Sequence, residues 1–137
     1  PQALEVEITE STLMTDARRT ERVMRQLHEM GISLSIDDFG TGYSSLAYLK
    51  RFPIDTLKID RSFVRDIPGD ADDSTITVAV LALAQSLKLE AIAEGVENAE
   101  QRDFLRARGC RFMQGYLFGK PLPAGDITRL LTAQAAS

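Results

Sequence analysis

The feature that most constrains the fold is a repeated alternation of short apolar segments with longer segments of helical periodicity. The expected strands are residues 4–8, 32–36, 56–60, 89–94 and 111–114. Each is followed by a stretch whose apolar residues recur at helical spacing or whose ends carry capping residues. This alternation favours an α/β fold in which mainly parallel strands are joined by helical crossovers.

The helices expected between and after these strands are residues 15–30, 46–52, 74–87, 98–108 and 123–133. Asn98 with Gln101 three residues later forms a capping-box pattern, and Gly31 and Gly109 are placed to end helices. Residues 61–73 read as an acidic connection containing proline and glycine. The side chains expected to face the core are Val23, Leu27 and Met30 in the first helix and Ile76, Val80, Leu83 and Leu87 in the third.

Two architectures fit this pattern. A TIM-like (β/α) barrel needs eight strand–helix units, of which the 137 residues would supply about five. An open, doubly wound sheet would be self-sufficient with five strands, and the strand pattern alone leaves both possible. The chain begins at Pro1 almost inside a strand, which indicates a piece of a longer protein.

The net charge, the single cysteine and the length of the apolar runs limit which partners and which compartment fit this chain. A net charge of -4 argues against a groove for a nucleic-acid polymer, although a bound metal could still help to hold a nucleotide. Cys110 is the only cysteine, and its place between Gly109 and an apolar segment indicates a small buried residue rather than a nucleophile. No apolar run approaches the length of a membrane span, so we expect a cytoplasmic segment without membrane contact.

Asp37 and Asp38 stand together at the end of the second expected strand and lead into a Gly-rich loop. Residues 37–45 read Asp-Asp-Phe-Gly-Thr-Gly-Tyr-Ser-Ser. Adjacent carboxylates repel each other, so a cation or hydrogen bonds should offset their cost. Hard divalent cations take such oxygen ligands. A strand that ends in an Asx-capped turn is the alternative, and the pair alone does not decide between them.

Polar side chains lie near the carboxyl end of every expected strand. They are Glu7 and Glu10, Asp37 and Asp38, Lys58 and Asp60, Glu94 and Glu97, and Gln114. In a parallel α/β layer these ends share one rim. Burying such groups separately costs on the order of several kcal/mol each. We therefore expect them to meet a metal ion or one another.

This set supports metal-assisted hydrolysis of a phosphate ester. Two cations roughly 4 Å apart would activate a water and stabilise charge on the phosphate. Lys58 would orient the water or neutralise charge, and Glu94 would take the proton. No nucleophile elbow, Walker loop or Cys–His pair competes with this interpretation. The only histidine, His28, lies late on an amphipathic helix, which indicates a surface or helix-end role.

Five motifs occur in order, at residues 7–11, 37–46, 57–60, 93–97 and 114–121. They read Glu-Ile-Thr-Glu-Ser, Asp-Asp-Phe-Gly-Thr-Gly-Tyr-Ser-Ser-Leu, Leu-Lys-Ile-Asp, Ala-Glu-Gly-Val-Glu and Gln-Gly-Tyr-Leu-Phe-Gly-Lys-Pro. Together they resemble the C-terminal part of an EAL domain, the bacterial cyclic di-GMP phosphodiesterase family. The resemblance implies a TIM-like barrel with one antiparallel strand. It also implies hydrolysis of cyclic di-GMP to linear pGpG with Mg²⁺ or Mn²⁺, as one or two ions.

By position, the resemblance gives Glu7, Asp37 and Asp38 the place of metal ligands, with Asp37 able to bridge two ions. Lys58 matches the lysine that contacts the catalytic water. Glu94 matches a glutamate described either as the general base or as support for the second metal.

Three further residues match motif positions. Gln114 matches a glutamine near metal and substrate, and Glu10 matches the glutamate that orders the loop after the paired aspartates. Glu97 is a weaker match, for which a structural role is the alternative. The loop and helix after the paired aspartates correspond to the surface through which family members form homodimers.

The Glu-Ala-Leu motif and an asparagine motif of the family are absent from residues 1–137. We therefore expect a truncated, C-terminal portion of the domain, whose parent is the enzyme and whose isolated activity is impaired. Two alternatives remain. One is a module that binds cyclic di-GMP or mediates dimerisation without turnover, and the other is an unrelated barrel hydrolase with the same rim.

Overall fold

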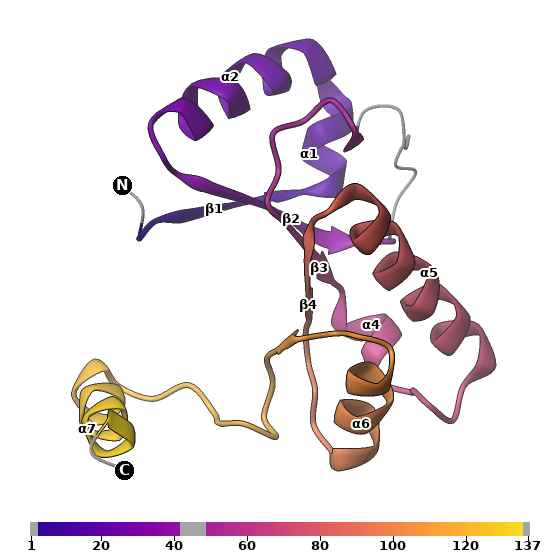
Figure 1. Ribbon diagram of the computed structural model, residues 1–137, viewed down its shortest axis with the longest axis vertical. Coiled ribbons are helices and arrows are strands. Elements are labelled where there is room, and N and C mark those ends of the chain that lie inside the picture. The colour runs from indigo at the N-terminus through magenta and orange to yellow at the C-terminus, as the bar shows by residue number, and fades with distance from the viewer. Residues whose placement is uncertain (1–2, 42–48, 136–137) are drawn as a thin grey trace.

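A five-stranded parallel sheet is the centre of the computed structural model, which describes residues 3–41 and 49–135 (Figure 1). Its strands are β1 (Glu5–Thr9), β2 (Ser33–Phe39), β3 (Thr56–Ile59), β4 (Glu90–Ala93) and β5 (Phe112–Met113). The helices are α1 (Glu10–Thr15), α2 (Ala17–Glu29), α4 (Arg61–Val64), α5 (Ala71–Leu87), α6 (Ala99–Ala107) and α7 (Ala124–Ala135).

The strand order decides between the two expected architectures. A doubly wound sheet reverses its order at a switch point. Here the strands follow the chain from one edge to the other, β1-β2-β3-β4-β5, and every neighbouring pair is parallel. The fold is therefore an arc of a TIM-like barrel, as the sequence predicts, with all strand carboxyl ends on one rim.

The register separates an apolar face of the sheet from a polar one. Leu34, Ile36, Leu57, Ile59 and Ala93 belong to the apolar face and are fully buried. They form one cluster with side chains of α2, α5 and α6. Because side chains alternate along a strand, the intervening residues lie on the opposite face, which is the inside of the barrel arc.

The inside of the arc is polar where most barrels carry branched apolar side chains. Glu7, Ser35, Thr56 and Glu90 are register neighbours across β1 to β4 and form one row on this face. The next row towards the carboxyl ends contains Lys58. This division of faces places the polar groups named above on the side of the sheet opposite the main core.

Helix starts follow the expected capping chemistry. Asp16 accepts the N–H of Arg19 at the start of α2. At α6 the capping box of Asn98 and Gln101 is present in both directions, which confirms that prediction. Cys110 is a free cysteine and is buried, as predicted. Helix α7 lies apart from the sheet, at the end of an extended segment (Figure 1).

The end of one predicted strand was wrong, and two segments contain helices that the sequence did not predict. β2 continues through Asp37 and Asp38 to Phe39, because a bulge lets the strand carry both aspartates. A further short helix, α1, follows β1 directly and was not expected. The segment predicted to be an irregular connection contains α4 and the first residues of α5, where Asp60 and Asp70 supply the caps.

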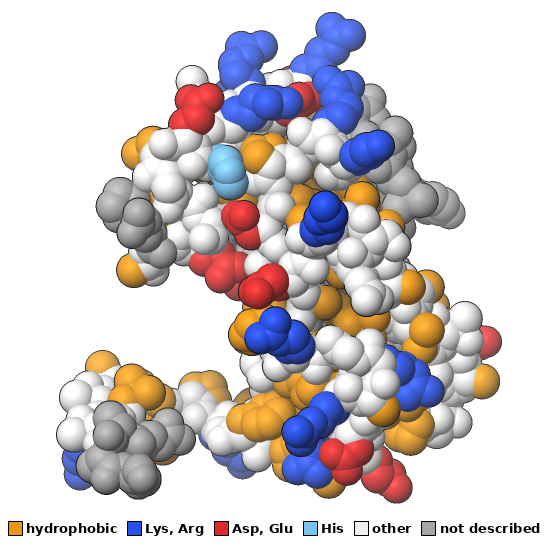
Figure 2. Space-filling model, in the orientation of Figure 1, with side chains coloured by type: hydrophobic (Ala, Val, Ile, Leu, Met, Phe, Trp, Pro, Cys, Tyr) orange, Lys and Arg blue, Asp and Glu red, His pale blue; other side chains and the backbone are white. Residues whose placement is uncertain are grey.

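The predicted inward face of α2 was also wrong. Met24 is the fully buried residue of this helix and Leu27 packs beside it, whereas Val23 and Met30 are exposed. Figure 2 shows Lys and Arg side chains gathered over α2. They fit a helix whose outer face is charged, because long cationic side chains are rarely buried.

The predicted helix at residues 46–52 and the Gly-rich loop before it fall mostly on residues 42–48, which lie outside the described residues. The proposed dimer surface falls on the same segment. In the described part of the chain, no helix has the length and apolar character needed to cross a membrane.

Candidate functional site

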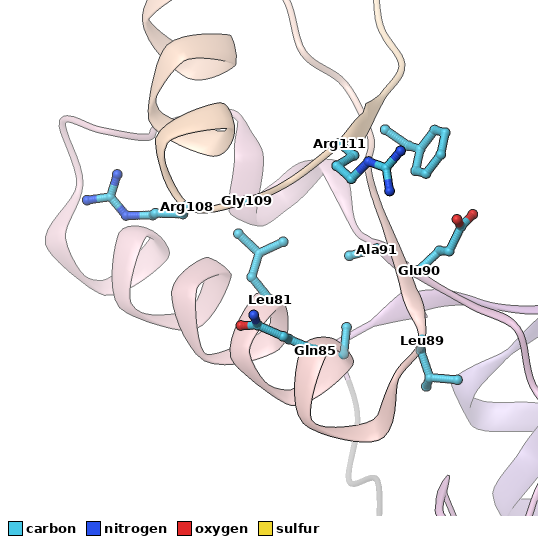
Figure 3. Close-up of a pocket in the computed structure, with 10 residues that line it drawn as sticks. Leu81, Gln85, Leu89, Glu90, Ala91, Arg108, Gly109 and Arg111 are labelled. Carbon is cyan, nitrogen blue, oxygen red and sulfur yellow. The ribbon is translucent and has the colours of Figure 1, made fainter.

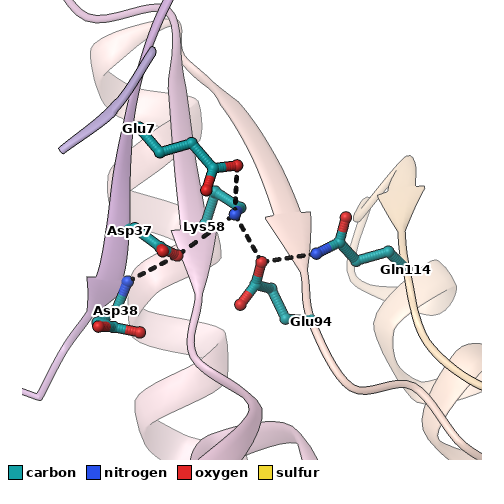
Figure 4. A network of polar contacts seen from close by, with 6 residues as sticks. All are labelled: Glu7, Asp37, Asp38, Lys58, Glu94 and Gln114. Atoms are coloured by element: carbon teal, nitrogen blue, oxygen red, sulfur yellow. Dashed lines mark hydrogen bonds and ion pairs between the residues drawn. The ribbon is translucent and has the colours of Figure 1, made fainter. Parts of the chain in front are cut away.

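Lys58 is the centre of the polar cluster at the carboxyl ends of the strands (Figure 4). Its Nζ lies 2.6 Å from Glu7 Oε1, 2.8 Å from Glu94 Oε1 and 3.4 Å from Asp37 Oδ1. Lys58 comes from β3, Glu7 from β1 and Asp37 from β2, while Glu94 directly follows β4. Four predicted site residues from four neighbouring strands are thus joined by one ammonium group.

The ammonium group of Lys58 is well shielded, because only 6% of the residue is exposed. Burial alone would lower the pKa of Lys58, but hydrogen bonds to Glu7 and Glu94 outweigh it and raise the pKa above its usual value. The side chain is therefore a fixed cation at neutral pH. It can orient or neutralise a reacting group, but it cannot act as a general base.

A β-bulge explains how two consecutive aspartates reach the same rim. Ile36 pairs with Leu57 and Phe39 with Ile59, so Asp37 and Asp38 together oppose Lys58. Asp38 adopts a φ of 55°, which is rare for a residue with a side chain. Bulges of this kind redirect side chains next to active sites. Without it, strict alternation would send the two carboxylates to opposite faces.

Asp38 lies among acids. Burial raises the pKa of the Asp38 carboxyl, and the charges of Asp37 and Asp60 raise it further. For Asp60, burial acts in the same direction, but hydrogen bonds from the Ser62 side chain and backbone N–H outweigh it and hold the pKa below its usual value. A nearby cation would therefore favour the charged form of Asp38.

Glu10 forms a hydrogen bond with the backbone just after the end of β2. It is the first residue of α1, it is 2% exposed, and its Oε2 accepts the backbone N–H of Gly40 at 3.0 Å. This contact ties the start of the loop after Asp37 and Asp38 to the neighbouring unit. The role of Glu10 in ordering the rest of that loop stays a prediction, because residues 42–48 lie outside the described residues.

Gln114 extends the cluster to the fifth strand. Its Nε2 donates to Glu94 Oε1 at 2.7 Å. A Cβ at Gly115 would lie 2.2 Å from the carbonyl oxygen of Val96, so only glycine allows the loops after β4 and β5 to pack this closely. The backbone N–H of Val96 donates to the Gln114 carbonyl at 3.0 Å. Glu94 and Gln114 are therefore positioned by backbone contacts between their loops.

A pocket of about 680 Å³ opens beside Glu94 and Gln114. One wall is α4, and the other walls are the loops that follow β4 and β5. Glu97 lines this pocket together with Glu94. The remaining lining residues include Asp60, Arg61, Ser62, Arg65, Tyr116 and Lys120. The pocket lining thus combines acids, cations and one tyrosine, a composition suited to a phosphate-bearing aromatic ligand.

Sequence reasoning gave no role to four of the pocket residues, Arg61, Arg65, Tyr116 and Lys120. Tyr116 and Lys120 stand inside a motif already singled out, so their proximity to Gln114 was the available signal. Arg61 directly follows Asp60 at a strand end, which was a weaker signal. Arg65 had no such signal, because its place in the pocket wall depends on α4, the helix directly before it, which the sequence did not predict.

A second pocket, of about 210 Å³, lies at the opposite ends of β4 and β5 (Figure 3). It is lined by Leu81, Gln85, Glu90 and Arg108 among others. In parallel α/β layers, chemistry takes place at the carboxyl ends of the strands. This pocket at the amino ends is therefore not the candidate site.

The oxygen donors of the cluster fit a hard divalent cation by their chemistry. Within residues 3–41 and 49–135, however, no three His, Cys, Asp or Glu side chains are arranged so as to hold an ion. Glu7, Asp37 and Glu94 converge instead on Lys58. An ion bound by these carboxylates would share their oxygens with the ammonium group.

The EAL domain family model matches residues 1–121 of the chain. The chain belongs to the EAL domain family. It is 52% identical to the cyclic di-GMP phosphodiesterase NbdA of Pseudomonas aeruginosa over 95% of its length, which is 17% of NbdA. It matches the structure of the PaMucR phosphodiesterase–c-di-GMP complex with a TM-score of 0.90 and 50% identity, covering 93% of this chain and 51% of that one.

A manganese/cyclic di-GMP complex of Klebsiella pneumoniae BlrP1 also matches this EAL chain, with a TM-score of 0.79 and 38% identity. That match covers 85% of this chain and 30% of BlrP1. The family resemblance predicted from the five motifs is thus confirmed. The chain spans less than a fifth of the length of NbdA.

Proposed function

We propose that this EAL chain is part of an enzyme that hydrolyses cyclic di-GMP to linear pGpG with the help of a divalent metal. The observation that carries the proposal is the cluster in which Lys58 joins Glu7, Asp37 and Glu94 at one rim. The adjoining pocket supports it, because its lining combines acids with cations and a tyrosine. Similarity to NbdA and to the PaMucR complex supports the choice of substrate.

Glu94 is the proposed general base. Gln114 and Lys58 both contact its Oε1, so neither contact uses Oε2, and the carboxylate is held in one orientation at the pocket wall. Such a group can accept a proton from a water placed between it and the substrate phosphate. Lys58 remains protonated, and it orients the water or offsets charge on the phosphate.

Glu7, Asp37 and Asp38 are the proposed ligands of Mg²⁺ or Mn²⁺, as one ion or two. Their donor chemistry fits, and the raised pKa of Asp38 means that a nearby cation would offset the cost of charging that carboxyl. A bound divalent ion would supply Lewis-acid stabilisation and a more acidic water. Gln114 is proposed to contact substrate, Glu10 to order the loop after Asp38, and Glu97 to support the pocket wall.

We further propose that residues 1–137 form the C-terminal portion of an EAL domain in a cytoplasmic protein. The buried free thiol of Cys110 supports a reducing compartment. A homodimer through the loop and helix that follow Asp38 belongs to the same proposal, without membrane contact or a nucleic-acid polymer as a partner. The isolated chain should hydrolyse substrate weakly or not at all, because the Glu-Ala-Leu and asparagine motifs of the family are absent from residues 1–137.

A second candidate function is binding of cyclic di-GMP, or dimerisation, without turnover. The arrangement of Glu7, Asp37 and Glu94 around an ammonium group, rather than around a site for an ion, favours this candidate for the chain alone. Such a module would still use the pocket beside Glu94.

The two candidates separate when this chain and a form extended upstream by about half a barrel are incubated with cyclic di-GMP and Mg²⁺. The products are resolved by chromatography, and Asp37→Asn in each form controls for contaminating activity. Linear pGpG from the extended form alone is the expected result. Bound nucleotide without product in both forms would refute the enzyme and favour the binding module.

A further inference from the structure

Gln101 is a buried polar side chain whose contacts reach well beyond its own helix. It is 2% exposed, and its Oε1 accepts the backbone N–H groups of Glu97 at 2.7 Å and Asn98 at 3.2 Å. Its Nε2 donates to the carbonyl oxygen of Arg65 at 2.8 Å. Capping α6 accounts for the contact with Asn98. It does not account for the bond to a residue 36 positions away.

The two ends of these contacts lie in different walls of the pocket beside Glu94. Arg65 follows α4, which forms one wall, and Glu97 belongs to the loop after β4, which forms another. The carboxamide of Gln101 therefore bridges the two walls from their buried side. Both groups that it bridges are backbone groups, so the side chain fixes the path of the chain on each side.

A steric contact joins the same two walls nearer the cluster. A Cβ on Gly95 would lie 2.7 Å from Arg61 Cβ, so the loop after β4 touches the start of α4 closely. Gly95 separates Glu94 from the residues that Gln101 anchors. The position of Glu97 therefore affects the position of Glu94, because only two residues separate them and one of these, Gly95, packs against α4.

We propose that Gln101 is a positioning residue that couples α4 to the loop of Glu94 and so sets the shape of the nucleotide pocket. The inference rests on the proposed function for the identity of the ligand. The link from Gln101 to Arg65 itself stands on burial and hydrogen bonds alone. Charge-neutral buried amides that satisfy three backbone groups specify one arrangement of the chain, because leaving any of those groups unpaired is costly.

Two variants separate this role from helix capping. Gln101→Glu keeps oxygens that accept from Glu97 and Asn98, and a helix N-terminus favours its ionised form. It loses the donor to Arg65 and places a carboxylate against that carbonyl oxygen. Asn98→Ala removes the reciprocal cap, in which Asn98 Oδ1 accepts the N–H of Gln101 at 2.9 Å, but leaves the bond to Arg65 intact.

The measurement is a ¹H–¹⁵N NMR comparison of the full chain at pH 8, followed by titration with cyclic di-GMP in Mg²⁺. In Gln101→Glu we expect amide shifts in both residues 94–97 and residues 61–65, together with an affinity for cyclic di-GMP lower by about tenfold. In Asn98→Ala we expect shifts confined to α6 and its cap, with affinity unchanged. Thermal midpoints of both variants show how far each one loosens the fold.

Unmoved amides at residues 61–65 in Gln101→Glu would overturn the proposal, and so would equal losses of affinity in the two variants. If the unaltered chain binds no cyclic di-GMP, the ligand assignment fails. In that case, the amide shifts measured without nucleotide still test whether Gln101 couples residues 61–65 to residues 94–97.

Discussion

Lys58→Met removes the cation that contacts the three carboxylates of the cluster, while keeping an unbranched side chain that is one atom shorter. The Lys58 Nζ lies between 2.6 and 3.4 Å from Glu7, Asp37 and Glu94. Removing one member of a buried ion pair typically costs about 3–5 kcal/mol, because the remaining charge is left uncompensated. The Glu7 side chain is 51% exposed and can turn towards water, so we expect a loss of about 2–3 kcal/mol in unfolding free energy.

The assay is urea unfolding at pH 7 and low salt, first in EDTA and then with Mn²⁺. An ion at a hundred times its dissociation constant adds about 2.7 kcal/mol, which is close to the loss expected for Lys58→Met. In that variant the carboxylates no longer share their oxygens with an ammonium group. Mn²⁺ should therefore stabilise Lys58→Met more than the unaltered chain. Lys50→Met makes the same substitution at an exposed position and should change neither value.

Two results would refute this reasoning. A loss below about 1 kcal/mol in EDTA would mean that the contacts of Lys58 are worth no more than those of a surface pair. Equal stabilisation of both proteins by Mn²⁺ would mean that the ion and the ammonium group do not share ligands. The second result would also weaken the assignment of Glu7 and Asp37 as metal ligands.

Three further outcomes follow from single features of the structure. Because the pKa of Asp38 is raised in the folded chain, its charge destabilises the fold above the unfolded pKa near 3.9. Asp38→Asn should therefore raise the urea midpoint at pH 7 and lose that advantage below about pH 4; equal midpoints at pH 7 would contradict this. Gly115→Ala should cost about 2–4 kcal/mol, since its Cβ would lie 2.2 Å from Val96, whereas Gly119→Ala meets no atom within 4 Å and should be neutral in urea unfolding. Cys110 is buried with a raised pKa, so a thiol reagent should label it only as fast as the chain unfolds; rapid labelling of the folded chain would disprove that burial.

Local signals in the sequence were enough to predict most of the fold. The alternation of strands and helices and the capping box of Asn98 and Gln101 depend on neighbours in the chain. The shared rim followed from parallel strands, because their carboxyl ends lie together whatever the details of packing. Sequential strand order could not be predicted in this way, since pairing depends on contacts between distant segments.

The errors arose where a distant contact decides a local choice. On α2, Leu27 belongs to two possible apolar stripes, and the sheet selects the one containing Met24 over the one containing Val23 and Met30. The bulge at Asp37 and Asp38 depends on pairing with β3. The expectation that the polar groups of the rim would meet a metal or one another was not among these errors, because Lys58 is long enough to reach three of the acids.

The polar inside of the barrel arc limits what can close over it. Ser35 is fully buried beside Glu7 and Thr56, and among the described residues its Oγ has no hydrogen-bond partner. An unpaired buried hydroxyl costs on the order of 1–3 kcal/mol. Because the chain itself already covers this hydroxyl, a surface that completes the barrel would meet Glu7 in this row instead, whose side chain is 51% exposed. An apolar surface there would add the cost of burying that carboxylate, so a polar surface is required. Completion of the fold and completion of the site thus depend on the same partner surface, since the row of Ser35 lies directly below Lys58.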